Sequence, residues 1–337
     1  MDHNKIQVGV IGCGSIGREH IERLTNVVPE TEVVAVYDYV SEPAETAAQQ
    51  YGATVYESGE ALIRSDEVDA VLIASTDDTH AAYVMEALKQ NKYVFCEKPL
   101  ALSAEECEKM IEIEASQGHR LVQMGFNRRY DSGYVEMKEA IQNNEIGEPL
   151  MIHSAHRNIS QSPGFKTDYA ITRVAIHEID ISRWLLDEEY DEVQVLKVKQ
   201  SKQTSGDWLN PQLVTFKTLS GQRVDVEVQT DGAYAYDIRC QVVGENGTLD
   251  LPDPASVVKR NNQSVSNELA TTWAGRFGKS YDDEFLCWAK GILNDQLMGA
   301  STWDGYAACV TSDALIKSRD SGKPEKVTMI EQPDIYK

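Results

Sequence analysis

Three glycines near the start of the chain have the spacing of a phosphate-binding turn. Gly12, Gly14 and Gly17 form a G-x-G-x-x-G pattern directly after the short apolar run Ile6–Ile11. In such a pattern the first glycine permits a tight turn, the second lets a pyrophosphate approach the backbone, and the third lets the following helix pack closely. The spacing therefore predicts a dinucleotide site.

Residues on either side of the last glycine agree with this interpretation. Ser15 and Ile16 open the expected helix, whose N-terminal N–H groups would face the phosphates. Asp38 ends a second apolar run about 20 residues further on, the position of an acid that binds the ribose hydroxyls. A 2′-phosphate would meet like charge there, so we predict NAD rather than NADP. The alternative is an ordinary glycine turn in an unrelated α/β fold.

A lysine follows another apolar run at a place where ligands bind. Lys98 comes soon after Tyr93–Cys96, and Pro99 ends regular structure at that point. Ligands of open parallel sheets bind at the carboxyl ends of the strands, so this amine is a candidate substrate contact. The alternative is an exposed surface lysine, the commoner fate of that residue type.

Strands and helices that alternate along the N-terminal part would position these residues. We expect a Rossmann domain of α/β class over residues 1–125, which binds NAD. Its expected strands are 6–11, 33–37, 68–74, 93–96 and 120–124, and its expected helices are 16–24, 43–50, 80–91 and 104–117.

The pattern changes after residue 125. The rest of the chain, 126–337, is expected to be an α+β domain with an open, mainly antiparallel sheet, responsible for substrate binding and oligomerisation. Its expected strands are 151–158, 193–200, 213–219, 223–229 and 238–244, and its expected helices are 171–186, 281–293 and 303–318.

Composition excludes several classes of protein. The 337 residues allow about two domains, and 54 acidic against 32 basic residues give a net charge of -22, which repels nucleic acid and anionic membranes. No apolar stretch suits a signal peptide or a membrane span, and the six cysteines form no CxxC pair, so we expect a cytoplasmic protein with reduced thiols. His153 and His156 would lie on opposite faces of a strand, and we predict no metal site.

Longer motifs carry a resemblance to a known family. EKP after the fourth expected strand, GFNRRYD at the domain junction and HEID on a later helix occur in that order, as do YVFCEKPLA, IGEPLMIHSAHRN, YDIRCQVVGENG and WDGY. Over nearly its whole length the chain resembles the glucose-fructose oxidoreductase and inositol dehydrogenase (Gfo/Idh/MocA) family, most closely its bacterial inositol dehydrogenases. The resemblance implies that myo- or scyllo-inositol is oxidised to an inosose with NAD.

The resemblance also implies two catalytic residues. Lys98 would hydrogen-bond the substrate hydroxyl, and His177 would take its proton as general base while hydride leaves for the nicotinamide. An imidazole, with an unperturbed pKa of about 6.5, suits this task. Without the resemblance, a structural role would be the better interpretation of a lone helical histidine. The active site would then lie in the cleft between the two domains.

One residue departs from the family pattern. The family normally has an aspartate four residues before the histidine, where this chain has Arg173. On an α-helix Arg173 and His177 would share one face, and the guanidinium would favour the neutral imidazole. Arg173 could bind substrate hydroxyls and change the preferred isomer, could mark lost activity, or could turn away to Glu178 or Asp180. We favour substrate binding.

Further residues are assigned to the site by the same resemblance. The additional cofactor-binding candidates are Ser75, His80 and Glu97, and the additional substrate-binding candidates are Arg128, His156, Asn158, Asp180 and Tyr236. A cyclic polyol needs many directional donors and acceptors in a small volume. Two alternatives stay open: strand packing explains Tyr236 equally well, and a helix cap at Asp78 or Thr79 explains the segment around His80.

Other functions remain possible at this level. A dehydrogenase of another sugar or polyol in the same family would share the catalytic core, and a non-catalytic NAD-binding regulator is conceivable because the aspartate is missing. The retained Lys98 and His177 argue against the regulator. The resemblance further implies a homotetramer formed through the open face of the C-terminal sheet.

Overall fold

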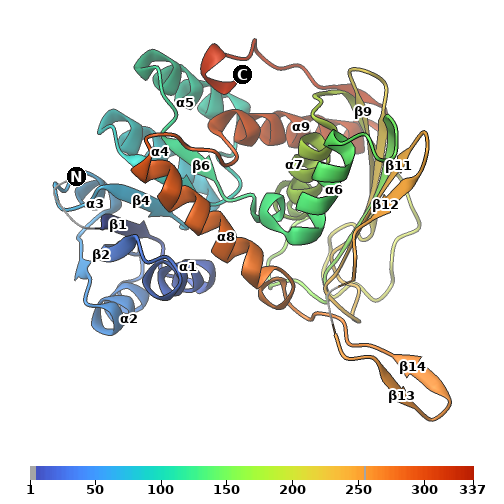
Figure 1. Cartoon of the computed structure of the whole chain (residues 1–337), viewed down its shortest axis with the longest axis horizontal. Coiled ribbons are helices and arrows are strands. Elements are labelled where there is room, and N and C mark those ends of the chain that lie inside the picture. The colour runs from blue at the N-terminus through green and yellow to red at the C-terminus, as the bar shows by residue number, and fades with distance from the viewer. Residues whose placement is uncertain (1–4, 254–255) are drawn as a thin grey trace. The chain divides into compact units, whose positions relative to one another are not determined.

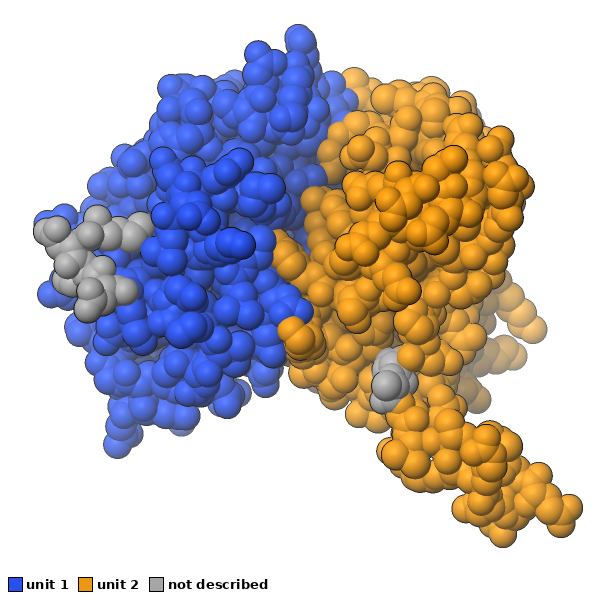
Figure 2. Space-filling model, in the orientation of Figure 1, with its two compact units in different colours: residues 1–126, 281–309, 329–337 blue, residues 127–280, 310–328 orange. Residues whose placement is uncertain are grey.

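The chain folds into two compact units, which are coloured separately in Figure 2. The computed structural model describes residues 5–253 and 256–337. Unit 1 comprises residues 1–126 together with two later segments, 281–309 and 329–337, and unit 2 comprises residues 127–280 and 310–328. Unit 1 is therefore assembled from three separate stretches of the chain.

The described part of unit 1 contains a six-stranded parallel sheet. Its order is β3-β2-β1-β4-β5-β6, so the strand numbers run outwards in both directions from β1. Ligands of open α/β sheets bind where the order reverses, here between β1 and β4. The strands are β1 (Ile6–Ile11), β2 (Thr31–Tyr37), β3 (Thr54–Val55), β4 (Ala70–Ile73), β5 (Tyr93–Cys96) and β6 (Val122–Met124).

Helices connect consecutive strands of this sheet (Figure 1). They are α1 (Ser15–Asn26), α2 (Ser41–Tyr51), α3 (Gly59–Ile63), α4 (Asp77–Lys89) and α5 (Ala104–Gln117). The later part of α8 (Trp273–Leu293) adds Phe285 and Trp288 to the core of the unit, where the Phe285 ring stacks on Phe95 at 4.4 Å between centroids. A helix from late in the sequence thus completes the apolar interior around β1 and β5.

Unit 2 contains a seven-stranded mixed sheet of order β12-β11-β7-β10-β9-β8-β15. The β7–β10 pair is parallel, and the other neighbouring strands are antiparallel. Alternation of buried and exposed residues is regular along β9 and β10, as expected for a sheet with one packed face. The strands are β7 (Pro149–Arg157), β8 (Tyr190–Leu196), β9 (Gln212–Thr218), β10 (Arg223–Gln229), β11 (Asp237–Gly244), β12 (Thr248–Asp250) and β15 (Glu325–Lys326).

Helical segments and one hairpin accompany this sheet. The hairpin formed by β13 (Lys259–Asn261) and β14 (Ser264–Ser266) projects away from the rest of unit 2 (Figure 1). The helical segments are η1 (Asn127–Tyr130), α6 (Ser132–Gln142), the π-helical turn η2 (Ala170–Ala175), α7 (Ile176–Leu186) and α9 (Thr302–Ser321), with η3 (Asp334–Tyr336) near the end of the chain. None of the described helices combines the length and hydrophobicity of a membrane span.

The expected fold class is confirmed: a Rossmann-type parallel sheet precedes an α+β part with a mainly antiparallel sheet. The first residues of some helices differ from those expected. Helix α4 begins at Asp77 rather than residue 80, and α8 begins at Trp273 rather than residue 281. Helix α6 was not expected at all. It begins after Asp131, whose side chain accepts a hydrogen bond from the Tyr134 N–H, a capping signal that is easily overlooked at the end of the NRRY turn.

Candidate active site

The turn between β1 and α1 leaves no room for side chains at two of its glycines. Gly12 has φ = 96°, a left-handed conformation that favours glycine, and a Cβ there would lie 2.5 Å from the backbone of Ala74 and Ser75. A Cβ on Gly17 would lie 1.9 Å from the carbonyl oxygen of Gly12. At Gly14, by contrast, a Cβ would meet nothing within 4 Å, so there is space beside this residue.

The first turn of α1 is suited to a phosphate group. Gly14 is the N-cap and supplies no side-chain cap, and the first turn, which begins with Ser15 and Ile16, contains no acidic residue. Backbone N–H groups at such a helix end attract anions. Together with the space beside Gly14, this arrangement fits the pyrophosphate of a dinucleotide.

Asp38 lies against the same turn. Its Oδ2 accepts a hydrogen bond from the Cys13 N–H at 2.7 Å, and its Oδ1 accepts one from the Val40 N–H at 2.9 Å. A carboxylate has about four acceptor sites, so these two bonds orient it and leave capacity for ribose hydroxyls. The residues that the sequence assigned to the pyrophosphate and to the ribose of NAD are therefore neighbours.

Ser75 and His80 link the end of β4 to the loop after β5 that contains Lys98 and Pro99, here called the lysine loop. The Ser75 hydroxyl lies 2.7 Å from the hydroxyl of Thr79, and the buried His80 ring lies between two carbonyl oxygens: Nδ1 is 2.7 Å from that of Pro99 and Nε2 is 3.2 Å from that of Ser75. The N-cap of α4 is Thr76 and makes no side-chain bond, so the proposed cap at Asp78 or Thr79 is wrong. His80 instead ties the loop after β5 to the end of β4.

Lys98 follows β5 as expected and is half-buried. The Lys98–Pro99 peptide bond is cis. Glu97, a predicted cofactor-binding residue, contacts two protein groups: Oε1 lies 2.7 Å from Nε2 of the buried His20, and Oε2 accepts the Lys98 N–H at 3.2 Å. His20 had not been singled out in the sequence, and only its position three residues after Gly17 could have drawn attention to it.

In unit 2, His177 is the second residue of the regular helix α7, which directly follows a π-helical turn. Arg173 lies within that turn and is exposed, with its guanidinium carbon 3.7 Å from the centre of the Tyr169 ring. A π-helical turn has more residues per turn than an α-helix, so the simple four-residue argument for one shared face does not apply to Arg173 and His177. Such turns are frequent at functional sites.

Three buried polar side chains form one group beside His177. Arg128 donates from Nη1 to Glu178 Oε1, and its Nη2 lies 3.0 Å from Nδ1 of His156. The same Nδ1 lies 3.0 Å from Glu178 Oε2. One ring nitrogen cannot donate to a carboxylate and accept from a guanidinium at once, and the charge-assisted bond to the carboxylate is the stronger. We therefore assign the proton of His156 to Nδ1.

Charge interactions keep Arg128 and Glu178 ionised. Burial raises the pKa of the Glu178 carboxyl, but the Arg128 guanidinium and His156 lower it by more, so the pKa lies below its ordinary value. Burial lowers the pKa of the Arg128 guanidinium, but the charge of Glu178, its hydrogen bond and the neighbouring Tyr134 and Tyr236 together raise it by more. Arg128 is only 2% exposed and contacts protein groups in this structure, and its contact with substrate stays a prediction.

Other predicted substrate residues surround His156. The His156 and His177 rings lie 6.2 Å apart between centroids, and the Tyr236 ring contacts His156 edge to face at 5.6 Å. The Oδ1 atom of Asn158 is buried and has no hydrogen-bond partner among the described residues. A buried acceptor of this kind costs free energy unless a ligand or water satisfies it.

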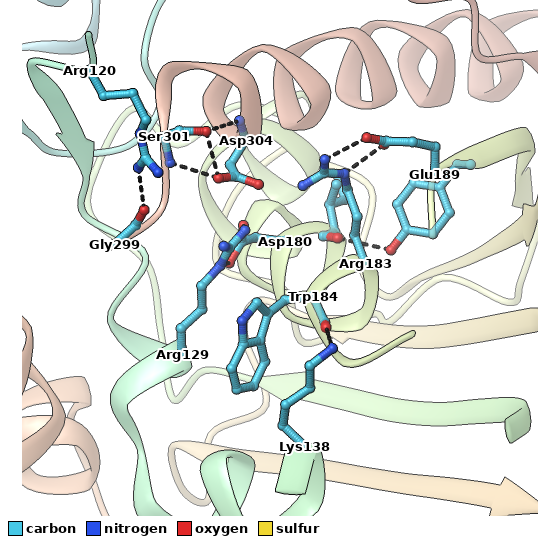
Figure 3. Close-up of polar contacts among 12 residues, drawn as sticks. Arg120, Arg129, Lys138, Asp180, Arg183, Trp184, Glu189, Gly299, Ser301 and Asp304 are labelled. Atoms are coloured by element: carbon cyan, nitrogen blue, oxygen red, sulfur yellow. Dashed lines mark hydrogen bonds and ion pairs between the residues drawn. The ribbon is translucent and has the colours of Figure 1, made fainter. Parts of the chain in front are cut away.

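Asp180 has a partner that sequence reasoning missed. Arg129 donates from Nε at 3.0 Å and from Nη2 at 2.5 Å to the two carboxylate oxygens of Asp180, a bidentate pair (Figure 3). Asp180 is buried, so the pair neutralises its charge. Both arginines of the NRRY turn therefore hold carboxylates of α7, and the adjacent basic residues in GFNRRYD were the available signal.

Two groups of candidates thus emerge, one in each unit. Unit 1 brings together the glycine turn, Asp38, Ser75, His80, Glu97 and Lys98. Unit 2 brings together Arg128, His156, His177 and Tyr236, with Asn158 at the end of β7. His153 is exposed while His156 is buried, which agrees with opposite faces of the strand. Among the described residues there is no cluster of side chains that could hold a metal ion.

Comparison with known proteins agrees with both units. The profile of an oxidoreductase family described by its NAD-binding Rossmann fold matches residues 6–126, and the profile of the C-terminal alpha/beta domain of the same family matches residues 138–329. Together these two matches cover most of the chain.

Individual relatives are similar over their full length. An inositol 2-dehydrogenase from Burkholderia lata is 45% identical over 334 residues, which cover 98% of this chain and 99% of that one, and an inositol 2-dehydrogenase from Klebsiella pneumoniae has the same identity and coverage. The crystal structure of myo-inositol dehydrogenase from Lactobacillus casei in complex with NAD(H) and myo-inositol has a TM-score of 0.95 at 34% identity, and covers 99% of this chain and 100% of that one.

Proposed function

Because the chain belongs to the Gfo/Idh/MocA family of NAD-binding oxidoreductases, we propose that it is an inositol dehydrogenase. It would oxidise one secondary hydroxyl of myo- or scyllo-inositol to the ketone of an inosose. The observation that carries this proposal is the 45% identity to inositol 2-dehydrogenase over 98% of the chain and 99% of the relative. A match over both full lengths includes the substrate part of the relative as well as its nucleotide part.

The reaction requires removal of one proton and one hydride. When bound, NAD accepts the hydride that leaves the carbinol carbon. His177 takes the hydroxyl proton on an imidazole nitrogen, and Lys98 hydrogen-bonds the same oxygen through its ammonium group. The ammonium stabilises negative charge that develops on the oxygen, while the imidazole titrates in the pH range where a general base is useful.

Buried acceptors and donors would hold the ring of the polyol. The unsatisfied Oδ1 of Asn158 supports a role in accepting a substrate hydroxyl hydrogen. With Nδ1 of His156 protonated toward Glu178, the Nε2 lone pair is the other hydrogen-bonding group of that ring. Arg173 would then contact a hydroxyl that distinguishes inositol isomers. Arg128 and Asp180 act indirectly, by holding α7 and His156 in place.

One assay tests the proposal. The purified protein is mixed with NAD and each of myo-inositol, scyllo-inositol, glucose and related sugars, and NADH formation is followed by absorbance. We expect kcat/KM to be highest for an inositol. A higher value for glucose or another sugar would assign a different dehydrogenase, and tight NAD binding without turnover of any polyol would favour a non-catalytic regulator.

Two further expectations accompany this function. A homotetramer is expected in solution, and light scattering after size-exclusion chromatography measures it. The expected cytoplasmic location agrees with a reaction that uses NAD.

A further inference from the structure

A buried hydrogen-bonded pair lies next to the Lys98 backbone in unit 1. Nε2 of His20, on α1, is 2.7 Å from Oε1 of Glu97. The side chain of His20 is fully buried and that of Glu97 is 8% exposed. Nδ1 of His20 is buried and has no hydrogen-bond partner in the described part of the chain. Among the described residues, the hydrogen bond that this ring makes is therefore the one to Glu97, in which Nε2 of His20 is the donor.

Aromatic side chains prevent His20 from taking another position. Its ring lies 4.7 Å from that of Phe285, 5.6 Å from that of Tyr281 and 6.0 Å from that of Phe95, between centroids. A buried imidazole in apolar surroundings is costly unless its N–H is satisfied. Glu97 satisfies it, and no described contact gives His20 a separate role.

Glu97 is fixed from two other directions. Its Oε2 accepts the backbone N–H of Lys98 at 3.2 Å. A Cβ on Gly125, just after β6, would lie 3.2 Å from the carboxylate, so the backbone of Gly125 packs directly against it. The carboxylate therefore joins α1, the lysine loop and the end of β6.

The pair also places a charge beside Lys98. Burial raises the pKa of the Glu97 carboxyl, but the hydrogen bond from His20 and the charges of His20 and Lys98 lower it by more, so Glu97 is ionised. The titratable groups that face this carboxyl are His20 on α1, His80 on α4 and the chain neighbours Cys96 and Lys98.

We propose that His20 and Glu97 are a positioning pair. They hold Lys98 in the position that catalysis requires and connect it to helix α1, which follows the glycine turn. The inference rests on the proposed role of Lys98. Helix α1 carries the phosphate-binding turn at its N-terminus and His20 one turn further on, so one short rigid element connects the two functions. Misplacement of a catalytic group by about 1 Å can cost about 100-fold in rate.

The test compares two substitutions of His20. His20→Leu removes the donor, whereas His20→Gln keeps an N–H group at nearly the same distance from the backbone. We expect His20→Leu to lower kcat by about 10- to 100-fold with little change in KM for the polyol, and His20→Gln to restore most of the loss.

Glu97→Gln removes the charge of the carboxylate with little change of side-chain volume. It should also lower kcat with little change in KM, because the carboxylate that accepts the N–H groups of His20 and Lys98 becomes a neutral amide.

Phe285→Leu is the matched control, since it alters the same aromatic cluster without touching the carboxylate. Thermal unfolding and NAD affinity are measured for every variant. Equal losses of kcat in Phe285→Leu and His20→Leu, or wild-type kcat in both His20→Leu and Glu97→Gln, would overturn the positioning role. Lys98→Met is measured in parallel. If Lys98→Met is inactive while His20→Leu and Glu97→Gln are fully active, the positioning role alone is refuted. If Lys98→Met is active, the proposed role of Lys98 itself is refuted.

Discussion

At the scale of single residues, Glu178 connects three side chains that the sequence had assigned separately. It accepts from Arg128 and from Nδ1 of His156, and it follows His177 in the chain. A carboxylate that holds Nδ1–H of an imidazole fixes both the tautomer and the orientation of the ring. The direction in which His156 presents its second nitrogen is therefore set by a residue that does not itself contact solvent.

Arg173 stands where the family resemblance led us to expect an aspartate, and we predict that it contributes to isomer preference. Arg173→Asp should change the ratio of kcat/KM between myo- and scyllo-inositol by about 10- to 150-fold, because a hydrogen bond to a charged group is worth about 1.5–3 kcal/mol. The guanidinium is exposed and stacked on Tyr169, so the substitution removes little buried surface. Initial rates with each isomer give the ratio.

Arg64→Asp is the control for this substitution, since Arg64 is an exposed residue of unit 1 that pairs with Glu86. It should leave the ratio unchanged. The same ranking and ratio of isomers in Arg173→Asp as in the wild type would show that Arg173 does not contact the distinguishing hydroxyl.

At the scale of elements, two helix starts organise the chemistry. Helix α1 begins at a glycine turn, where close backbone contacts at Gly12 and Gly17 hold the helix end against β4. Helix α7 begins after the π-helical turn 170–175, which sets the direction from which His177 emerges. In both cases an irregular backbone precedes a regular helix and gives its first turn an orientation that a continuous helix would not have.

The three glycines allow a prediction that separates folding from nucleotide binding. Gly17→Ala should destabilise unit 1 by about 1–3 kcal/mol and abolish NAD binding, since its Cβ would overlap the carbonyl of Gly12. Gly14→Ala should unfold at nearly the wild-type temperature but bind NAD more weakly, because its methyl group would occupy the open space expected for the pyrophosphate. Thermal unfolding with and without NAD measures both effects. Wild-type NAD affinity in Gly14→Ala would contradict the placement of the pyrophosphate.

At the scale of the whole molecule, the net charge of -22 makes ionised carboxylates a determinant of stability. Most of these groups are at the surface, but Glu97 and Glu178 are buried and have pKa values held below the ordinary one. A carboxyl whose pKa is lower in the folded state contributes stability above its unfolded pKa, and this contribution is lost as the pH falls through the folded value. Acid should therefore destabilise both units.

Glu178→Gln tests this linkage. At pH 7 the variant should be less stable than the wild type by about 3 kcal/mol, because Arg128 is left buried without its carboxylate. The difference should narrow as the pH falls below about 4.5, the ordinary pKa of the group, since the wild-type carboxyl is then progressively protonated. Denaturant unfolding at several pH values gives the difference. Glu105→Gln, in an exposed pair with Lys109, should change stability little at any pH, and a pH-independent difference for Glu178→Gln would contradict the ionised pair.

Local patterns in the sequence predicted the glycine turn, the acid at Asp38, the place of Lys98 after β5 and most strands and helices of residues 5–126, although β3 and α3 were not expected. These features depend on backbone conformation and hydrophobic periodicity, which neighbouring residues set among themselves. Family motifs added His177 and its companions, although no local signal distinguishes a catalytic histidine from a structural one.

Only the tertiary structure decided which polar groups pair. It joined His20 to Glu97 across 77 positions and Arg128 to Glu178 across 50, and it added Phe285 and Trp288 to the core of unit 1. The physical reason is that a buried charge or N–H pairs with whichever complementary group the packing of distant elements brings within about 3 Å. Sequence spacing sets which face of an element a side chain occupies, and packing sets what it meets there.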